Sequence, residues 1–193
     1  MTTSESTPTT VTGSAGDGIV PDTKDWTWVL ERPCPDCGLD TPRVVREDVA
    51  GMVRANARGW SRVLAGDVAG LRRRPEPGVW SDLEYACHVR DVFRLFAVRL
   101  GLMLDQDDPL FANWDQDATA VADRYAEQDP GVVAGELAEA AEVLAAAFER
   151  VAGAQWERTG NRSDGARFTV ESFARYLIHD PVHHLFDVTG ERV

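Results

Sequence analysis

The stretch HDPVHHLFDV, residues 179–188, holds three of the four histidines of the chain, together with carboxylates and a proline. Imidazole nitrogens and carboxylate oxygens are common ligands of divalent transition metals. If the stretch is helical, it offers two pairs at positions i and i+4, His179 with His183 and Asp180 with His184. One helical turn rises about 5.4 Å, so either pair can converge on one ion. Only one of the two pairs can face a given point.

The fourth histidine, His88, lies in the sequence YACHVRDV, in the middle of another predicted helix. A ligand from this helix would complete a three-ligand site with either pair. Such a site leaves positions open for water or substrate, as catalytic metal sites require. Helical periodicity favours Asp180 with His184 slightly, because these residues continue an apolar line of the last helix. Periodicity does not exclude the other pair.

Pro181 allows a second interpretation of Asp180. Within a helix, this proline removes the hydrogen bond to the carbonyl of Leu177, at a typical cost of about 3 kcal/mol. Alternatively, a new helix begins here, with Asp180 as its N-cap and Pro181 at the first helical position, where proline is favoured. In that case Asp180 is a cap and not a ligand.

Four long segments predict the helices that position these residues. Apolar residues recur at helical spacing through 46–66, and the second helix begins near Ser81, with Glu84 completing a capping-box pattern. The alanine-rich segment 129–151 is the third, and the last begins near Thr169. These segments predict an all-α bundle in a single domain, residues 25–193, with an irregular N-terminal extension. Residues 1–24 are rich in Ser, Thr, Gly and Pro and predict a flexible tail. We expect a polar connection at 105–125 and a loop or short hairpin at 155–170.

Composition excludes several classes of function. The formal net charge of −12 argues against a nucleic-acid partner, because such proteins need a basic face. No apolar run approaches the ~20 residues that span a bilayer, so we expect no membrane partner. The N-terminal residues lack the pattern of a signal peptide. With 3 cysteines, a disulfide scaffold is not expected, and the cytoplasm is the expected location.

The sequence CPDC, residues 34–37, has the spacing of half a zinc site or of a redox pair. A structural zinc ion needs two further ligands, and Cys87 is the only other cysteine. A simple turn with two small residues is the interpretation we favour for Cys34 and Cys37. Their role stays open.

The sequence GVWSDLEYACHVRDVFRLF, followed about ninety residues later by YLIHDPVHHLFDV, resembles the DinB-like superfamily. This superfamily includes the mycothiol-dependent maleylpyruvate isomerases and the bacillithiol and mycothiol S-transferases. The resemblance covers roughly residues 45–190. It implies an up-down four-helix bundle with one divalent ion near one end, held by a histidine of the second helix and by a His/Glu-x-x-x-His pair of the last helix.

His88 matches the first of these ligand positions. His184 matches the last, because the residues that follow it, ending in Asp187 and Val188, fit the family pattern. Asp180 then stands where the isomerases carry glutamate, although aspartate is the shorter side chain. The resemblance therefore implies the ligands His88, Asp180 and His184, with His179 and His183 as the alternative register. Asp91 or Asp187 could orient a ligand imidazole through a hydrogen bond.

The resemblance implies a metal-dependent enzyme that binds a low-molecular-weight thiol, such as mycothiol, and attaches it to a small electrophile or isomerises the electrophile through an adduct. A composition rich in Ala, Gly, Arg and Asp resembles that of actinobacteria, which favours mycothiol. Zinc is the preferred ion, with nickel or iron as alternatives. The expected partners are the electrophile and the thiol, and a homodimer stays open. Two other classes also stay open, a hydrolase that uses metal-bound water, with His183 or Glu84 as base, and a non-catalytic stress-response binding module.

Overall fold

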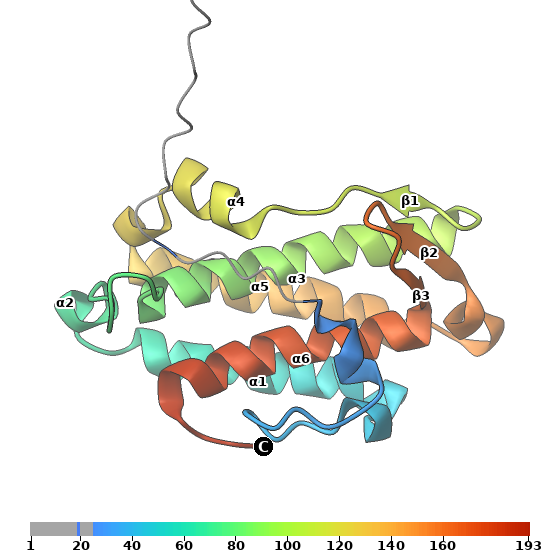
Figure 1. The fold of residues 1–193 in the computed structure, drawn as a ribbon, viewed down its shortest axis with the longest axis horizontal. Coiled ribbons are helices and arrows are strands. Elements are labelled where there is room, and N and C mark those ends of the chain that lie inside the picture. The colour runs from blue at the N-terminus through green and yellow to red at the C-terminus, as the bar shows by residue number, and fades with distance from the viewer. Residues whose placement is uncertain (1–18, 20–24) are drawn as a thin grey trace, which may run out of the picture.

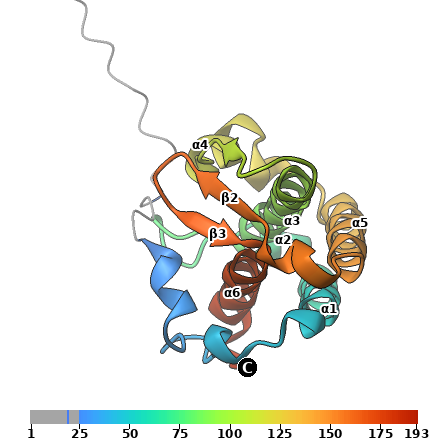
Figure 2. The ribbon, with the colours of Figure 1, turned by 90° about the vertical axis from the view of Figure 1, so that its right-hand side faces the viewer.

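The computed structural model describes Ile19 and residues 25–193. Its four long helices are α1 (Val49–Leu64), α3 (Asp82–Asp105), α5 (Pro130–Glu149) and α6 (Val170–Thr189). They lie side by side in one bundle, seen from the side in Figure 1 and from one end in Figure 2. The predicted all-α four-helix bundle is therefore confirmed. Apart from Ile19, the predicted flexible tail at residues 1–24 lies outside the described residues.

The predicted helix starts carry the expected caps. At the start of α3, the backbone N–H of Glu84 donates to Ser81 Oγ (3.3 Å), and the N–H of Ser81 donates to Glu84 Oε2 (2.8 Å). Thr169 and Ser172 form the corresponding capping box of α6. Asp129 caps α5, whose first residue is Pro130. These caps satisfy backbone donors that a helix start otherwise leaves without partners.

Around the bundle, the helices follow the order α1, α5, α3, α6, so that α1 and α3 each pack between α5 and α6. The long helices α1 and α3, which follow each other in the chain, therefore lie diagonally across the bundle. The chain from α3 to α5 crosses the length of the bundle (Figure 1), and α3 and α5 run in the same direction. The bundle keeps the four expected helices, but the crossover makes α3 and α5 parallel, whereas a simple up-down order would make them antiparallel. The crossover also carries the strand β1 (Leu110–Phe111), the short helix α4 (Gln116–Ala122) and the 3-10 turn η4 (Tyr125–Glu127).

A small sheet closes one end of the bundle. The strands β2 (Thr159–Arg162) and β3 (Arg167–Thr169) form an antiparallel hairpin, and β1 pairs with β2 in parallel. The hairpin lies within the segment where a loop or hairpin was expected. Gly160 of β2 is required by close packing, because a Cβ atom there would lie 2.8 Å from Met103 Cγ and 3.0 Å from Phe111 Cε1. The short helix α2 (Val68–Leu71) follows α1, and the 3-10 turn η5 (Gly153–Glu157) precedes β2.

The N-terminal extension packs along α6. It contains the 3-10 turns η1 (Trp26–Leu30), η2 (Thr41–Arg43) and η3 (Arg46–Asp48), and all three contact α6. The hydroxyl of buried Thr41 donates to the carbonyl oxygen of Val29, which ties η1 to η2. The CPDC sequence lies in the loop between these two turns. This loop therefore passes over the helix that carries three histidines.

Helix α6 continues through Pro181, from Val170 to Thr189. The interpretation of Asp180 as the N-cap of a new helix is therefore wrong. Asn56 of α1, which is buried, donates a hydrogen bond of 2.7 Å to the carbonyl oxygen of Pro181. This bond ties α1 to α6 at the proline and helps to fix the last two turns of α6 against the bundle.

Candidate metal centre

Helices α3 and α6 bring together His88, Asp180 and His184, called the His–Asp–His triad below. One donor atom from each residue lies within 4.8 Å of the others. Nε2 of His88 lies 3.4 Å from Oδ1 of Asp180, and Nε2 of His184 lies 3.8 Å from Oδ2 of the same carboxylate. Donors that bind one ion at about 2.0–2.2 Å lie about 3–3.5 Å from one another. The separations in the triad are near this range, so the shorter aspartate side chain can reach a shared ion.

Aromatic rings hold the imidazoles of the triad in place. Trp114, on the crossover connection, stacks on His88 with a centroid distance of 5.3 Å and an interplanar angle of 7°. Trp80 packs against His88 from another direction at 5.2 Å, and Tyr85 packs on His184 at 5.0 Å. His88 is fully buried by this packing. The crossover connection thus places one wall of the site.

The two aspartates considered for orienting a ligand differ in their contacts. Oδ2 of Asp187 lies 3.0 Å from Nδ1 of His184, the contact expected beneath a metal-binding imidazole. Asp91 instead accepts hydrogen bonds from Arg90, Arg94 and the hydroxyl of Tyr125. Its carboxylate makes no hydrogen bond to a ligand imidazole. Of the two aspartates, Asp187 therefore contacts an imidazole of the triad, and Asp91 does not.

The electrostatics of the triad suit a bound cation. Burial alone would raise the pKa of Asp180, but the nearby His88 and His184 imidazoles outweigh it and lower this pKa to about 2. Among the described residues, the buried atoms Oδ1 of Asp180 and Nδ1 of His88 have no hydrogen-bond partner. Oδ1 is an acceptor that lies 3.4 Å from Nε2 of His88 without forming a hydrogen bond. A divalent ion would give this oxygen a partner and use a donor set of two imidazoles and one carboxylate, which suits zinc, nickel or ferrous iron.

The other two histidines of α6 lie on a neighbouring face. His179 and His183 meet Cys34 and Cys37, and one donor atom from each of the four residues lies within 4.8 Å of the others. We call these four residues the cysteine–histidine cluster. The alternative register requires His179 and His183 to meet His88. Among the described residues, they instead form a group with the two cysteines. Burial and the neighbouring His183 lower the pKa of His179 to about 4, and burial raises the pKa of Cys37 to about 11.

In the sequence, CPDC predicts at most half a zinc site, because Cys87 is the only other cysteine. The spacing of the cysteines and histidines carries the further signal. Two cysteines separated by two residues, followed later by two histidines separated by three, is a frequent ligand pattern of zinc sites. In the sequence, His179 and His183 are expected as the alternative pair for His88, and His183 also as a candidate base.

The triad lies beside a cleft of about 770 Å³ between the crossover connection, the β2–β3 hairpin, η1 and α6. Both Asp180 and His184 line it. Its walls combine the rings of Trp26, Trp114 and Tyr176 with polar side chains, which include Asn113, Asp115, Gln116, Arg162 and Asp164. No local sequence pattern marks most of these wall residues, because they come from segments far apart in the chain.

Comparison with known proteins agrees with this architecture. The sequence model of the DinB superfamily matches residues 51–186, which is more than half of the chain, and the chain therefore belongs to the DinB superfamily. Among solved structures, the fold is similar to that of YfiT from Bacillus subtilis, with a TM-score of 0.69 and 18% sequence identity, covering 75% of this chain and 84% of that chain. YfiT is described as a probable metal-dependent hydrolase with an unusual four-helix bundle topology. No curated protein matches this chain.

Within the part of the chain that the structure describes, no helix combines the length and the apolar composition needed to cross a bilayer.

Proposed function

We propose that this protein is a divalent-metal-dependent enzyme that joins a low-molecular-weight thiol, of the mycothiol type, to a small electrophile or isomerises the electrophile through a thiol adduct. The observation that carries the proposal is the His–Asp–His triad beside a cleft of about 770 Å³. Three donors leave positions open on an ion, and the cleft gives room for two small molecules next to it.

A divalent ion held by the triad would lower the pKa of a thiol bound to it, so that the nucleophilic thiolate is available near neutral pH. The residues of the chain supply the rest of the site. Asp187 orients the His184 imidazole, with Oδ2 at 3.0 Å from Nδ1. Trp80 and Trp114 pack on His88, which is fully buried, and exclude water from it.

The thiol must come from outside the chain. Cys34, Cys37 and Cys87 are 1%, 0% and 0% exposed, so none of them can reach a substrate in the cleft. All three are free of disulfide bonds. Free cysteines and a thiol cosubstrate both suit a reducing cytoplasm, which is the location we propose.

The cleft walls favour a thiol that carries sugar-like groups. Flat rings such as those of Trp26 and Trp114 can pack on a sugar ring, and the amides of Asn113 and Gln116 can bond to hydroxyl groups. Carboxylates such as Asp115 accept hydrogen bonds from hydroxyl groups as well. Mycothiol is a hydroxyl-rich, sugar-based thiol and matches these walls better than a purely apolar thiol would.

The description of YfiT keeps hydrolysis as a second candidate, with water in place of the thiol. The two bases considered for this reaction are already engaged. The carboxylate of Glu84 accepts hydrogen bonds from Arg74 and from the backbone of Ser81. His183 belongs to the cysteine–histidine cluster. These contacts favour the thiol-dependent reaction.

The deciding experiment incubates metal-loaded protein with an electrophile, for example maleylpyruvate or chlorodinitrobenzene, with and without mycothiol. We expect conversion only when both metal and thiol are present, and we expect the His88→Ala variant to lose it. Glu191→Gln, an exposed change beyond the end of α6, is the matched control and should behave as the wild type. Conversion of the electrophile by metal-loaded protein without any thiol would overturn the proposal and favour the hydrolase.

A further inference from the structure

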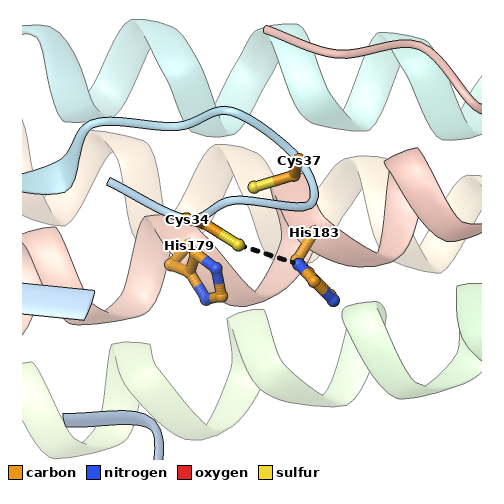
Figure 3. A group of neighbouring side chains, drawn as sticks. All are labelled: Cys34, Cys37, His179 and His183. Atoms are coloured by element: carbon orange, nitrogen blue, oxygen red, sulfur yellow. Dashed lines mark hydrogen bonds between the residues drawn. The ribbon is translucent and has the colours of Figure 1, made fainter. Parts of the chain in front are cut away.

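The cysteine–histidine cluster joins two segments that are far apart in the chain. Cys34 and Cys37 lie in the loop between η1 and η2, and His179 and His183 lie one turn apart on α6 (Figure 3). Sγ of Cys34 lies 3.6 Å from Nδ1 of His183. All four donor atoms fall within 4.8 Å of one another, as donors around one ion must.

The backbone of the cysteine loop is folded to present both thiols to α6. The N–H of Cys34 donates to the carbonyl of Leu39 (2.9 Å), and the N–H of Gly38 donates to the carbonyl of Cys34 (3.0 Å). Gly38 has a φ of +87°, which residues other than glycine rarely adopt. This turn leaves the side chains of Cys34 and Cys37 on the face that packs on the helix.

Burial distinguishes this cluster from a surface group of polar residues. Cys34, Cys37 and His179 are at most 4% exposed, and the side chain of His183 is 12% exposed. Nε2 of His179 is buried and has no hydrogen-bond partner among the described residues. Burying two thiols and two imidazoles with so few hydrogen bonds is costly, unless an ion satisfies them.

The donor set differs from the triad in what it can hold. Two sulfurs and two nitrogens in a tetrahedral arrangement are typical of zinc. Four protein ligands leave no open position, which is the property of structural sites rather than catalytic ones. The triad, in contrast, provides three ligands, although His179 and His183 line the same cleft as Asp180 and His184.

We propose that the cysteine–histidine cluster binds one zinc ion with a structural role, separate from the metal of the triad. The ion fastens the N-terminal extension to α6. It thereby also builds the cleft, because the ring of Trp26, which lines the cleft, packs on His179 at 5.3 Å and on His183 at 5.2 Å.

The test measures zinc in tag-free protein purified without chelator. We expect Cys37→Ser to lose one zinc per chain relative to the wild type. His88→Ala should retain this zinc, and Cys87→Ala, which changes the cysteine outside the cluster, should have the zinc content of the wild type. Cys37→Ser with the full zinc content of the wild type would overturn the proposal.

X-ray absorption at the zinc edge of the His88→Ala protein tests the ligands directly. We expect two sulfur neighbours at about 2.3 Å and two nitrogen neighbours at about 2.0–2.1 Å. A shell of nitrogen and oxygen alone would contradict the proposal. So would a disulfide between Cys34 and Cys37 in freshly isolated protein, detected by mass spectrometry as the loss of two hydrogens.

Two measurements on proteins with intact clusters cover the case in which Cys37→Ser does not fold. Titration of wild-type thiols with a mercurial reagent should release zinc as Cys34 and Cys37 react. Removal of zinc from His88→Ala by a chelator should lower its Tm, and an unchanged Tm would overturn the structural role. Neither readout depends on activity, so failure of this inference is distinguishable from failure of the proposed function.

Discussion

His183 and His184 are consecutive residues whose imidazoles belong to different clusters. Their ring centroids are 6.1 Å apart and their planes are inclined by 75°. Nδ1 of His183 lies 3.6 Å from Sγ of Cys34, whereas Nε2 of His184 lies 3.8 Å from Oδ2 of Asp180. Successive residues of a helix point about 100° apart, so a step of one residue directs the second ring to another face of α6.

This relationship assigns different partners to the two i,i+4 pairs, His179 with His183 and Asp180 with His184. They are not competing registers for one ion, because each pair meets its own partners. Asp180 and His184 face His88 of α3, and His179 and His183 face the cysteine loop. One segment of α6 can therefore support a catalytic and a structural site side by side.

Replacement of His88 by alanine tests the triad. We expect the variant to lose the ion of this centre and its metal-dependent activity to fall by more than about 100-fold. Loss of a ligand should exceed the 10–100-fold effect of losing a residue that hydrogen-bonds to a ligand. Metal analysis and kinetics measure the two effects. Full metal content and activity in a folded His88→Ala protein would exclude the triad as the metal centre.

Asp187→Ala tests the hydrogen bond behind His184. Without the carboxylate that lies 3.0 Å from Nδ1, the ring is less firmly oriented, and we expect metal affinity at the triad to fall about 10–100-fold. Competition with a chromogenic chelator measures this affinity. Asp187 Oδ1 also lies 3.7 Å from Nε2 of His183, so the substitution could affect the cysteine–histidine cluster as well. The zinc of that cluster is therefore measured in the same titration. Glu191→Ala, beyond the end of the same helix, is the control, and an equal effect of both changes would contradict the specific role.

Glu84 gives a pH-dependent contribution to stability. Burial raises its pKa, but the hydrogen bonds from Arg74 and Ser81 outweigh burial, so the folded pKa lies below the ordinary value of 4.5 for glutamate. A carboxylate with a lowered folded pKa stabilises the fold above its unfolded pKa, and this stabilisation is lost as pH falls through the folded pKa. We expect Glu84→Gln to lower the free energy of unfolding by about 2 kcal/mol at neutral pH.

Urea unfolding across a pH series checks this expectation. The difference between wild type and Glu84→Gln should shrink as pH decreases below about 4.5, because the wild-type carboxylate then takes up its proton. A difference that stays constant down to the acid transition would show that the ionised carboxylate contributes nothing.

Gly160→Ala tests the packing of the hairpin that forms part of the cleft wall. The added Cβ atom would lie 2.8 Å from Met103 Cγ and 3.0 Å from Phe111 Cε1, and both side chains are buried. We expect a loss of about 1–3 kcal/mol in the free energy of unfolding, measured by denaturant titration. Gly101→Ala on α3 is the matched control, because its Cβ atom would meet nothing within 4 Å. There the better helix propensity of alanine should stabilise the fold, and equal destabilisation of both variants would refute the packing argument.

Local features of the fold were predictable because they depend on neighbours in the sequence. The capping boxes at Ser81 and Thr169 and the proline after Asp129 mark helix starts, and the structure has helices at each of them. The crossover from α3 to α5 was not predictable, because a polar connection carries no apolar pattern that fixes its path. Its path decides that Trp114 stacks on His88.

The amino-acid sequence is enough to place two ligand pairs on α6, His88 on another helix, and Cys34 and Cys37 in one short loop. These facts follow from helical periodicity and spacing. Which pair meets His88 depends on the packed fold, because the rotation of α6 about its axis is set by packing across the bundle, including the bond from Asn56 to the carbonyl of Pro181. The position of the cysteine loop on α6 also depends on the packed fold, since that contact joins residues nearly 150 positions apart.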